Sequence, residues 1–302
     1  MTDAQRDDTR IGALLAFSAY MFWGMVTVYW KALDEFDPFE LIGWRITTSV
    51  VVLVAILLAK RRFTPLLGAL RNRTLLFRTC AASVLLTVNW TMFVWAVVNE
   101  HVVETALGYF ISPILTTVLG VVRLRERLSV LQRTAITFAG IGLLILTIAY
   151  GRIPWIALSI AVSWSLYGYL KKLVPLGALE SLAAETMVLA VPAALFLAWG
   201  WNAETSIATN ATTVEWVLVA LTGTVTAIPL LLFGAASLRT PLSILGPMQY
   251  LVPTIYFLLG WAVYDEAVSA AKLVGFGAIW VCLVLVIVDL FTTQRRTAPA
   301  LT

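Results

Sequence analysis

The sequence predicts an all-α polytopic membrane protein, with ten transmembrane helices arranged as two inverted five-helix repeats. Three observations lead to this fold class: a composition that is 60% hydrophobic and only 13% charged over 302 residues, ten long apolar stretches, and basic residues gathered on one side of them. A typical soluble protein carries about 25% charged residues. The lipid bilayer is therefore expected to surround most of the chain.

Each apolar stretch approaches the roughly 20 residues that a helix needs to cross the hydrocarbon core. In chain order the expected spans are 11–31, 39–59, 75–98, 102–122, 130–149, 154–173, 180–200, 214–236, 242–264 and 270–291. The segments between them are too short for a soluble domain. The polar residues 1–10 precede a stretch that is too long for a signal-peptide core, so no cleavable signal is predicted.

Basic residues predict the orientation of the spans. With the N-terminus in the cytoplasm, 17 Lys and Arg fall in cytoplasmic segments, 3 fall on the opposite side, and Arg45 lies within a span. Positively charged loops favour the cytoplasm. We therefore expect a multi-pass membrane protein with both termini cytoplasmic and an even number of spans. Topology accounts for the net charge of +4, so no nucleic-acid partner is expected.

The two halves of the chain resemble each other. Four residues recur at an offset of 140: Pro113, Gly120, Glu126 and Ser129 return as Pro253, Gly260, Glu266 and Ser269. Residues 1–150 are therefore predicted to form one five-helix repeat and residues 151–302 the second. An odd number of spans per repeat inverts one half relative to the other. Inverted repeats are typical of secondary transporters, whose binding site lies where the halves meet.

Four expected spans carry a face of polar aromatic residues, glycine and proline at helical spacing. The residues of these faces that we assign to a candidate substrate path are Tyr20, Trp23 and Lys31 in the first span, Tyr109 in the fourth, Trp164, Tyr167 and Lys171 in the sixth, and Gln249 in the ninth. Tyr250, next to Gln249, is a further path candidate. The candidates for a helix break or hinge are Gly24, Pro113, Gly168 and Pro253. The alternative is a purely structural role, in close helix packing or anchoring at the membrane interface.

Charged side chains within the spans are further path candidates. A central arginine costs about 2.5–3.5 kcal/mol on insertion scales, so it usually faces the bundle interior and has a partner. Arg45 lies at a depth similar to that of Glu104 near the outer side, and Glu185 occupies the repeat position of Arg45 near the cytoplasm. We expect the pairs Arg45–Glu104 and Lys171–Glu185 at opposite ends of one path. Static structural pairing is the alternative.

The dipeptide Asn89-Trp90 places an amide beside an indole ring at membrane depth. An unsatisfied amide is costly there, so Asn89 is expected to bond either to a substrate or to a neighbouring helix, and both residues are path candidates. His101, the only histidine, lies in a short acidic loop. A lone histidine without clustered cysteines or carboxylates makes no convincing metal site, so no metal is predicted.

Motifs of common enzymes are missing from the sequence. It contains no G-x-x-x-x-G-K-[ST] phosphate-binding loop, and no serine elbow, H-E-x-x-H motif or dinucleotide fingerprint. We therefore expect neither enzymatic activity nor a cofactor, and energy from ATP would require another subunit. Two alternatives stay open: a membrane-embedded lipid-modifying enzyme and a non-transporting membrane scaffold.

Short motifs along nearly the whole chain resemble those of a known family. They are Ala19-Tyr20 with Trp23-Gly24, Pro38-x-Glu40 with Arg45, Asn89-Trp90, Leu107-Gly-Tyr-Phe-Ile111 with Pro113, Tyr167-Gly168 with Lys171-Lys172, and Gln249-Tyr250-x-x-Pro253. Together they are similar to the RarD-type permeases of the EamA family, in the drug/metabolite transporter superfamily. The resemblance implies an inner-membrane permease with a central cavity between two EamA-type repeats.

The expected function is secondary-active export of a small organic metabolite or drug by alternating access, with possible proton or solute coupling. The aromatic and charged lining favours amphipathic or zwitterionic substrates. The identity of the substrate and the oligomeric state are not determined by the sequence, because one fold serves many substrates.

Overall fold

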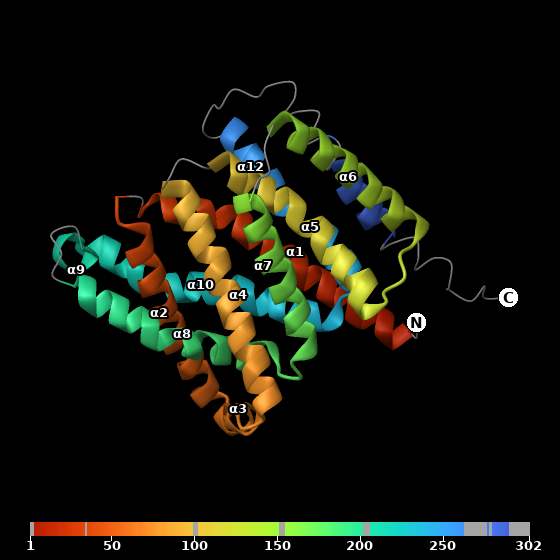
Figure 1. Cartoon of the computed structure of the whole chain (residues 1–302). Coiled ribbons are helices and arrows are strands. Elements are labelled where there is room, and N and C mark those ends of the chain that lie inside the picture. Colours follow the sequence, from red (N-terminus) through yellow and green to blue (C-terminus); the bar gives the residue numbers. More distant parts are fainter. Residues whose placement is uncertain are drawn as a thin grey trace.

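The computed structural model describes residues 3–33, 35–98, 102–150, 155–201, 206–262, 277 and 280–289. Helix is the only regular secondary structure within these residues (Figure 1). The described part of the chain is therefore all-helical, in agreement with the predicted fold class. The inverted arrangement of two repeats and the count of ten spans remain predictions.

Most helices match the expected spans closely. In the first half they are α1 (Asp3–Lys31), α2 (Pro38–Ala59), α3 (Phe63–Leu70), α4 (Arg73–Val98), α5 (Val102–Leu124) and α6 (Val130–Tyr150). In the second half they are α7 (Trp155–Leu173), α8 (Ala178–Gly200), α9 (Ile207–Asn210), α10 (Thr213–Arg239), α11 (Leu242–Met248) and α12 (Leu251–Ala262). Residues 280–289 are also helical.

Five of these helices contain segments that are long and apolar enough to cross a membrane by themselves. They are Asp7–Trp30, Pro38–Ala59, Arg73–Phe93, Ala178–Gly200 and Thr213–Arg239. Shorter apolar helices cover Gly108–Leu124 and Trp280–Asp289. The expected span 242–264 consists of two helices, α11 and α12, joined at Gln249 and Tyr250. Two proline residues in this span, Pro247 and Pro253, lie on either side of the join.

Helix starts follow from local side-chain chemistry. The side chain of Asp37 accepts a hydrogen bond from the backbone N–H of Glu40 at 2.9 Å, and Pro38 occupies the first turn of α2, where its missing N–H costs nothing. Thr212 and Glu215 form a reciprocal capping box at the start of α10. These caps supply acceptors for N–H groups that a helix leaves unpaired at its start.

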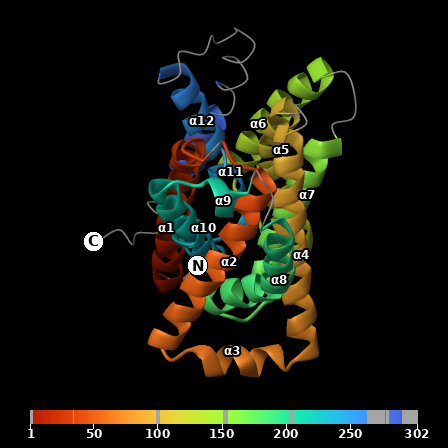
Figure 2. The ribbon, with the colours of Figure 1, turned by 90° about the vertical axis from the view of Figure 1, so that its left-hand side faces the viewer.

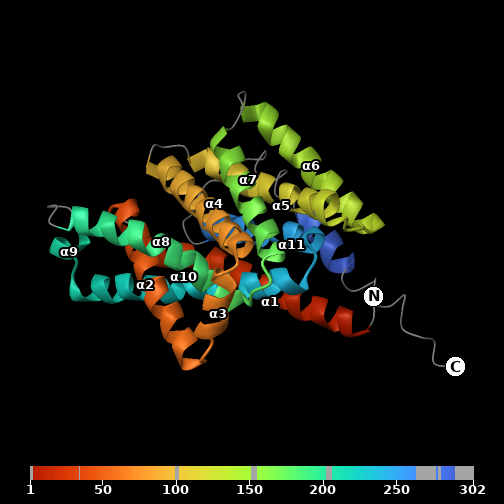
Figure 3. The same ribbon diagram turned by 60° about the horizontal axis from the view of Figure 1, so that its bottom comes forward.

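Seven helices and the α11–α12 pair pack side by side in a closed ring. Going around it, each element contacts the next in the order α1, α10, α2, α8, α4, α7, α5 and then the α11–α12 pair, which returns to α1. Helix α6 contacts α5 and lies at the periphery of the bundle (Figures 1 and 3). The ring therefore brings helices from both halves of the sequence around one interior.

The short helix α3 lies across one end of the bundle, between the end of α2 and the start of α4 (Figure 2). It contacts α4 and α8. Just before it, Arg62 donates from Nη1 to Oε1 of Glu180, near the start of α8, at 3.0 Å. The end of α2 therefore meets the start of α8, whereas Arg45 lies about two turns from the opposite end of α2.

Small residues let neighbouring helices approach closely in the ring. The main core cluster contains nine buried alanines among larger residues such as Tyr20, Leu86 and Phe233. At Gly223 of α10, an added Cβ would lie 2.3 Å from the backbone carbonyl carbon of Thr48 in α2. Only glycine permits this contact, as expected where membrane helices associate through small residues.

Candidate functional site

A cavity of about 250 Å³ lies inside the helix ring. Its walls come from α1, α2, α4, α5, α7, α10 and α12, together with the turn between α11 and α12. Both halves of the chain therefore contribute to it. The predicted path residues that line the cavity are Tyr20, Trp23, Arg45, Asn89, Trp90, Tyr109, Trp164 and Gln249.

Arg45 supplies the positive charge in the cavity wall. Its guanidinium carbon lies 4.2 Å from the ring centroid of Trp90 and 5.5 Å from that of Trp30. Cation–π contacts of this kind stabilise an arginine by about 0.5–2 kcal/mol. The predicted partner, Glu104, has its side chain outside the described residues, so the pair Arg45–Glu104 stays a prediction.

Two neutral amides in the wall are tied to neighbouring helices. Asn89 of α4 donates from Nδ2 to the carbonyl of Ile160 at 3.0 Å and to the hydroxyl of Ser163 at 3.3 Å, both in α7. Gln249 donates to Thr116 in α5 at 3.2 Å. These bonds hold α4 against α7 and the α11–α12 turn against α5. The Asn89 amide thus bonds to a neighbouring helix and also lines the cavity.

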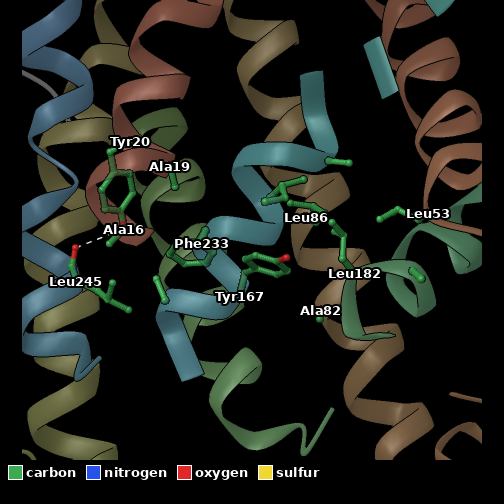
Figure 4. Packing of buried hydrophobic residues seen from close by; sticks show 14 of the residues in the cluster. Ala16, Ala19, Tyr20, Leu53, Ala82, Leu86, Tyr167, Leu182, Phe233 and Leu245 are labelled. Atoms are coloured by element: carbon green, nitrogen blue, oxygen red, sulfur yellow. Dashed lines mark hydrogen bonds between the residues drawn. The ribbon is translucent and has the colours of Figure 1, made fainter. Parts of the chain in front are cut away.

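Five aromatic side chains form a cluster that extends from the cavity wall into the core. Three of them, Tyr20, Trp23 and Trp164, line the cavity, and the other two do not. This aromatic cluster consists of Tyr20, Trp23, Trp164, Tyr167 and Phe233. Phe233 lies near its centre, with ring centroids 5.1 Å from Trp164, 5.9 Å from Trp23 and 6.3 Å from both tyrosines. Figure 4 shows Phe233 between Tyr20 and Tyr167. Trp23 and Trp164 also meet edge to face at 5.3 Å.

The predicted ion pair Lys171–Glu185 is present on the far side of the aromatic cluster. Lys171 Nζ lies 2.8 Å from Glu185 Oε1, and the two side chains are only 3% and 1% exposed. Ser181 bonds to both, accepting from Lys171 at 2.9 Å and donating to Glu185 at 2.7 Å. Tyr167 donates to the other oxygen of Glu185 at 2.9 Å. Each of these buried polar groups therefore has at least one hydrogen-bond partner, as a buried ion pair requires.

Tyr167, Lys171 and Glu185 therefore do not line the cavity. Tyr167 belongs to the aromatic cluster without reaching the cavity wall, and Lys171 and Glu185 lie beyond it. Tyr250 also points elsewhere: its hydroxyl donates to the carbonyl of Phe110 at 3.0 Å, within a separate core cluster. The side chain of Lys31 and the whole of His101 lie outside the described residues.

The four hinge candidates lie in different settings. Gly24 packs against Ile255 of α12, where an added Cβ would approach to 2.4 Å, whereas Gly168 leaves an ordinary 3.6 Å to Phe233. Helix α5 continues through Pro113 without a break. Pro253 lies in the first turn of α12, directly after the break between α11 and α12.

Sequence reasoning missed seven residues of the cavity wall. They are Val26, Trp30, Phe93, Ser112, Ile160, Leu230 and Val252. Helical spacing points to two of them, because Trp30 follows Trp23 by seven residues and Phe93 follows Asn89 by four. The aliphatic members give no such indication, since an apolar side chain that faces a cavity looks the same in a sequence as one that faces lipid.

Comparisons with known proteins identify the family. Residues 10–148 match the EamA-like transporter family. The chain is 40% identical to Protein RarD of Streptomyces exfoliatus, over 98% of this chain and 94% of that one. It belongs to the RarD-type permeases of the EamA family. A RarD-type permease is a multi-pass membrane transporter, which fits the apolar helices and the central cavity described above.

Other relatives agree with this assignment. Protein RarD of Escherichia coli strain K12 is 37% identical, over 96% of this chain and 98% of its own. An uncharacterized transporter of Vibrio cholerae is 36% identical, over 96% and 95%. A crystal structure with 18% sequence identity superposes with a TM-score of 0.70 and covers 93% of this chain and 98% of that one. At this identity, the RarD-type permease shares the fold with that protein and nothing more is implied.

Proposed function

We propose that this protein is a secondary-active transporter that exports a small organic metabolite or drug across the inner membrane by alternating access. The observation that carries the proposal is a cavity lined by both halves of the chain, separated from a buried ion pair by a layer of aromatic rings. The cavity binds the substrate. The aromatic cluster and the pair Lys171–Glu185 close the path on the cytoplasmic side, and both termini are cytoplasmic.

The order of helices in the ring supports two inverted repeats. The two halves can be matched helix by helix: α1 with α7, α2 with α8, α4 with α10, and α5 with the α11–α12 pair. When each helix is replaced by its match, every pair of neighbours in the ring is again a pair of neighbours. The contact of α1 with α10 becomes the contact of α7 with α4, and α2 with α8 maps onto itself. Two copies of one packing arrangement, in opposite orientation, are what an alternating-access mechanism uses.

The asymmetry between the two ends supports an open and a closed side. Arg45, near the start of α2, faces the cavity, whereas its repeat counterpart Glu185 is sealed by Lys171, Ser181 and Tyr167. In the opposite conformation the roles of the halves exchange: the contacts around Glu185 separate and the outer end closes around Arg45. Export then consists of loading from the cytoplasm in that conformation and release in the one described here.

Vesicle flux tests the proposal. Purified protein in liposomes, loaded with a panel of labelled metabolites, is assayed for efflux with and without an imposed pH gradient. We expect at least one compound to leave faster than from protein-free vesicles. Acceleration by the pH gradient indicates proton coupling, and acceleration by an external solute indicates exchange. A broad panel without any protein-dependent flux would contradict the proposal and favour a scaffold.

A topology experiment tests the even number of spans separately. Single cysteines replace Thr2 and Thr302 in a protein whose Cys80 and Cys282 have been changed to alanine. An impermeant thiol reagent added to intact cells should leave both new cysteines unlabelled, and should label both after the membrane is opened. Labelling of only one of them in intact cells would place the termini on different sides and end the ten-helix arrangement.

A further inference from the structure

Arg45 is the only charged residue in the cavity wall as far as the described residues show. Its guanidinium lies against the rings of Trp30 and Trp90. Such contacts use the positive charge but none of the five N–H groups that an arginine presents. These donors need acceptors, because a polar group kept from water is costly when it has no hydrogen bond.

For one of these donors, and for the counter-charge, the described residues offer no partner. Arg45 Nε is buried without a hydrogen-bond partner, and no described carboxylate oxygen lies within 4.0 Å of the guanidinium. The hydroxyl of Ser112, also in the cavity wall, is likewise buried without a partner. The cavity wall thus contains a fixed cation, and both Arg45 and Ser112 carry a polar atom without a partner among the described residues.

The rest of the wall is aromatic and neutral. Trp23, Trp164 and Phe93 offer ring faces and edges, and the donors of Asn89 and Gln249 already bond to neighbouring helices. An apolar body can lie against these rings, while Arg45 receives an acidic group. Arginine suits this role because its planar fork matches a carboxylate with two parallel hydrogen bonds.

We propose that the transported substrate is a small organic acid whose carboxylate binds Arg45 and whose apolar, ring-bearing body packs against the tryptophans of the cavity. This inference rests on the transport function proposed above and adds the chemical class of the substrate. A cationic substrate is repelled by Arg45. A neutral substrate provides no negative charge to balance the guanidinium within the membrane, where an unpaired charge is costly.

Three probes of matched shape test the charge preference. Phenylacetate, 2-phenylethanol and phenethylamine share a phenyl ring and carry an anion, a neutral hydroxyl and a cation at pH 7. Binding of each labelled probe to purified full-length protein in detergent is measured by equilibrium dialysis. We expect phenylacetate to bind at least about tenfold more tightly than either other probe, since hydrogen bonds between two charged groups are stronger than those to a neutral group.

Variants of Arg45 connect the preference to this residue. Arg45→Gln should lower phenylacetate binding by about tenfold or more and remove the difference between phenylacetate and 2-phenylethanol. Arg45→Lys keeps the charge without the planar fork and should retain part of the preference. The matched control is Arg133→Gln, an exposed arginine of α6, which should bind like the unmodified protein. If Arg45→Gln fails to fold, the three-probe comparison on the unmodified protein still decides.

Specific outcomes overturn the inference. Equal binding of the three probes, preference for phenethylamine, or absence of phenylacetate binding would each do so. Binding of phenylacetate only after Glu104→Gln would make Glu104 the counter-charge of Arg45 and exclude a substrate acid. Failure of this inference is distinguishable from failure of the transport proposal: protein-dependent efflux of the amine or the alcohol from vesicles would leave transport standing and reject only the acid.

Discussion

Lys171 Nζ and Glu185 Oε1 lie 2.8 Å apart beneath the aromatic cluster, with both side chains almost fully buried. Removal of one partner leaves an uncompensated buried charge, which typically costs 3–5 kcal/mol. We expect Lys171→Met or Glu185→Met alone to lower the thermal-unfolding midpoint strongly, and the double variant to recover most of the loss. Circular dichroism in detergent measures this. Single variants with an unchanged midpoint would show that the pair contributes nothing to stability.

The aromatic cluster is predicted to separate the cavity from the cytoplasm. Phe233→Ala removes its central ring, and such truncations usually cost about 3–5 kcal/mol. In a cysteine-free background, Val26→Cys places a reporter thiol in the cavity wall. We expect an impermeant reagent to reach it only from the outside in the parent, and from both sides after Phe233→Ala.

The control for this labelling experiment is Phe77→Ala, because the side chain of Phe77 in α4 is 74% exposed. Its removal should leave the labelling pattern unchanged. Labelling of the reporter from the cytoplasmic side in the parent protein would mean that the rings do not close the path.

A chain of hydroxyl groups holds the α11–α12 turn to α5 and α7. Gln249 donates to Thr116, Thr116 to Ser165, and Ser165 to the carbonyl of Ser112. Thr116→Val cuts the chain at its centre while keeping the side-chain shape, and should destabilise the protein by about 1–3 kcal/mol. In contrast, Thr134→Val, at an exposed hydroxyl that bonds only within α6, should stay within about 0.5 kcal/mol. If Thr116→Val and Thr134→Val lower the free energy of chemical unfolding equally, the hydrogen bonds through Thr116 do not contribute to stability.

Two glycines test the packing of the ring, because one is in close contact with a neighbouring helix and the other is not. Gly223→Ala would push a methyl group into the backbone of α2 at Thr48, so α2 and α10 must separate and the unfolding midpoint should fall. Gly140→Ala meets nothing within 4 Å in α6, and should raise stability by about 0.5–1 kcal/mol through better helix propensity. A midpoint that rises in both variants would mean that the close contact at Gly223 is absent.

Much of the candidate site follows from helical spacing in the sequence. Tyr20 and Trp23 share a face of α1, and Trp164 occupies the corresponding face of α7; all three line the cavity. The pair Lys171–Glu185 was also predictable, because α7 and α8 are joined by a short turn that returns one helix beside the next. A charge in an apolar span needs a partner, and the nearest opposite charge on the adjacent helix provides it.

The sequence by itself determined the membrane class, most helix positions, the RarD-type family and the faces that carry polar aromatic residues, since each of these depends on composition or periodicity within a single helix. Only the tertiary structure decided the order of helices in the ring and the exclusion of Tyr167 and Glu185 from the cavity wall. It also decided the contribution of Trp30, Ser112 and Val252 to that wall. The physical reason is that lipid and neighbouring helices are equally apolar. The sequence of one span therefore does not distinguish an apolar side chain that faces lipid from one that faces a neighbouring helix or an interior cavity.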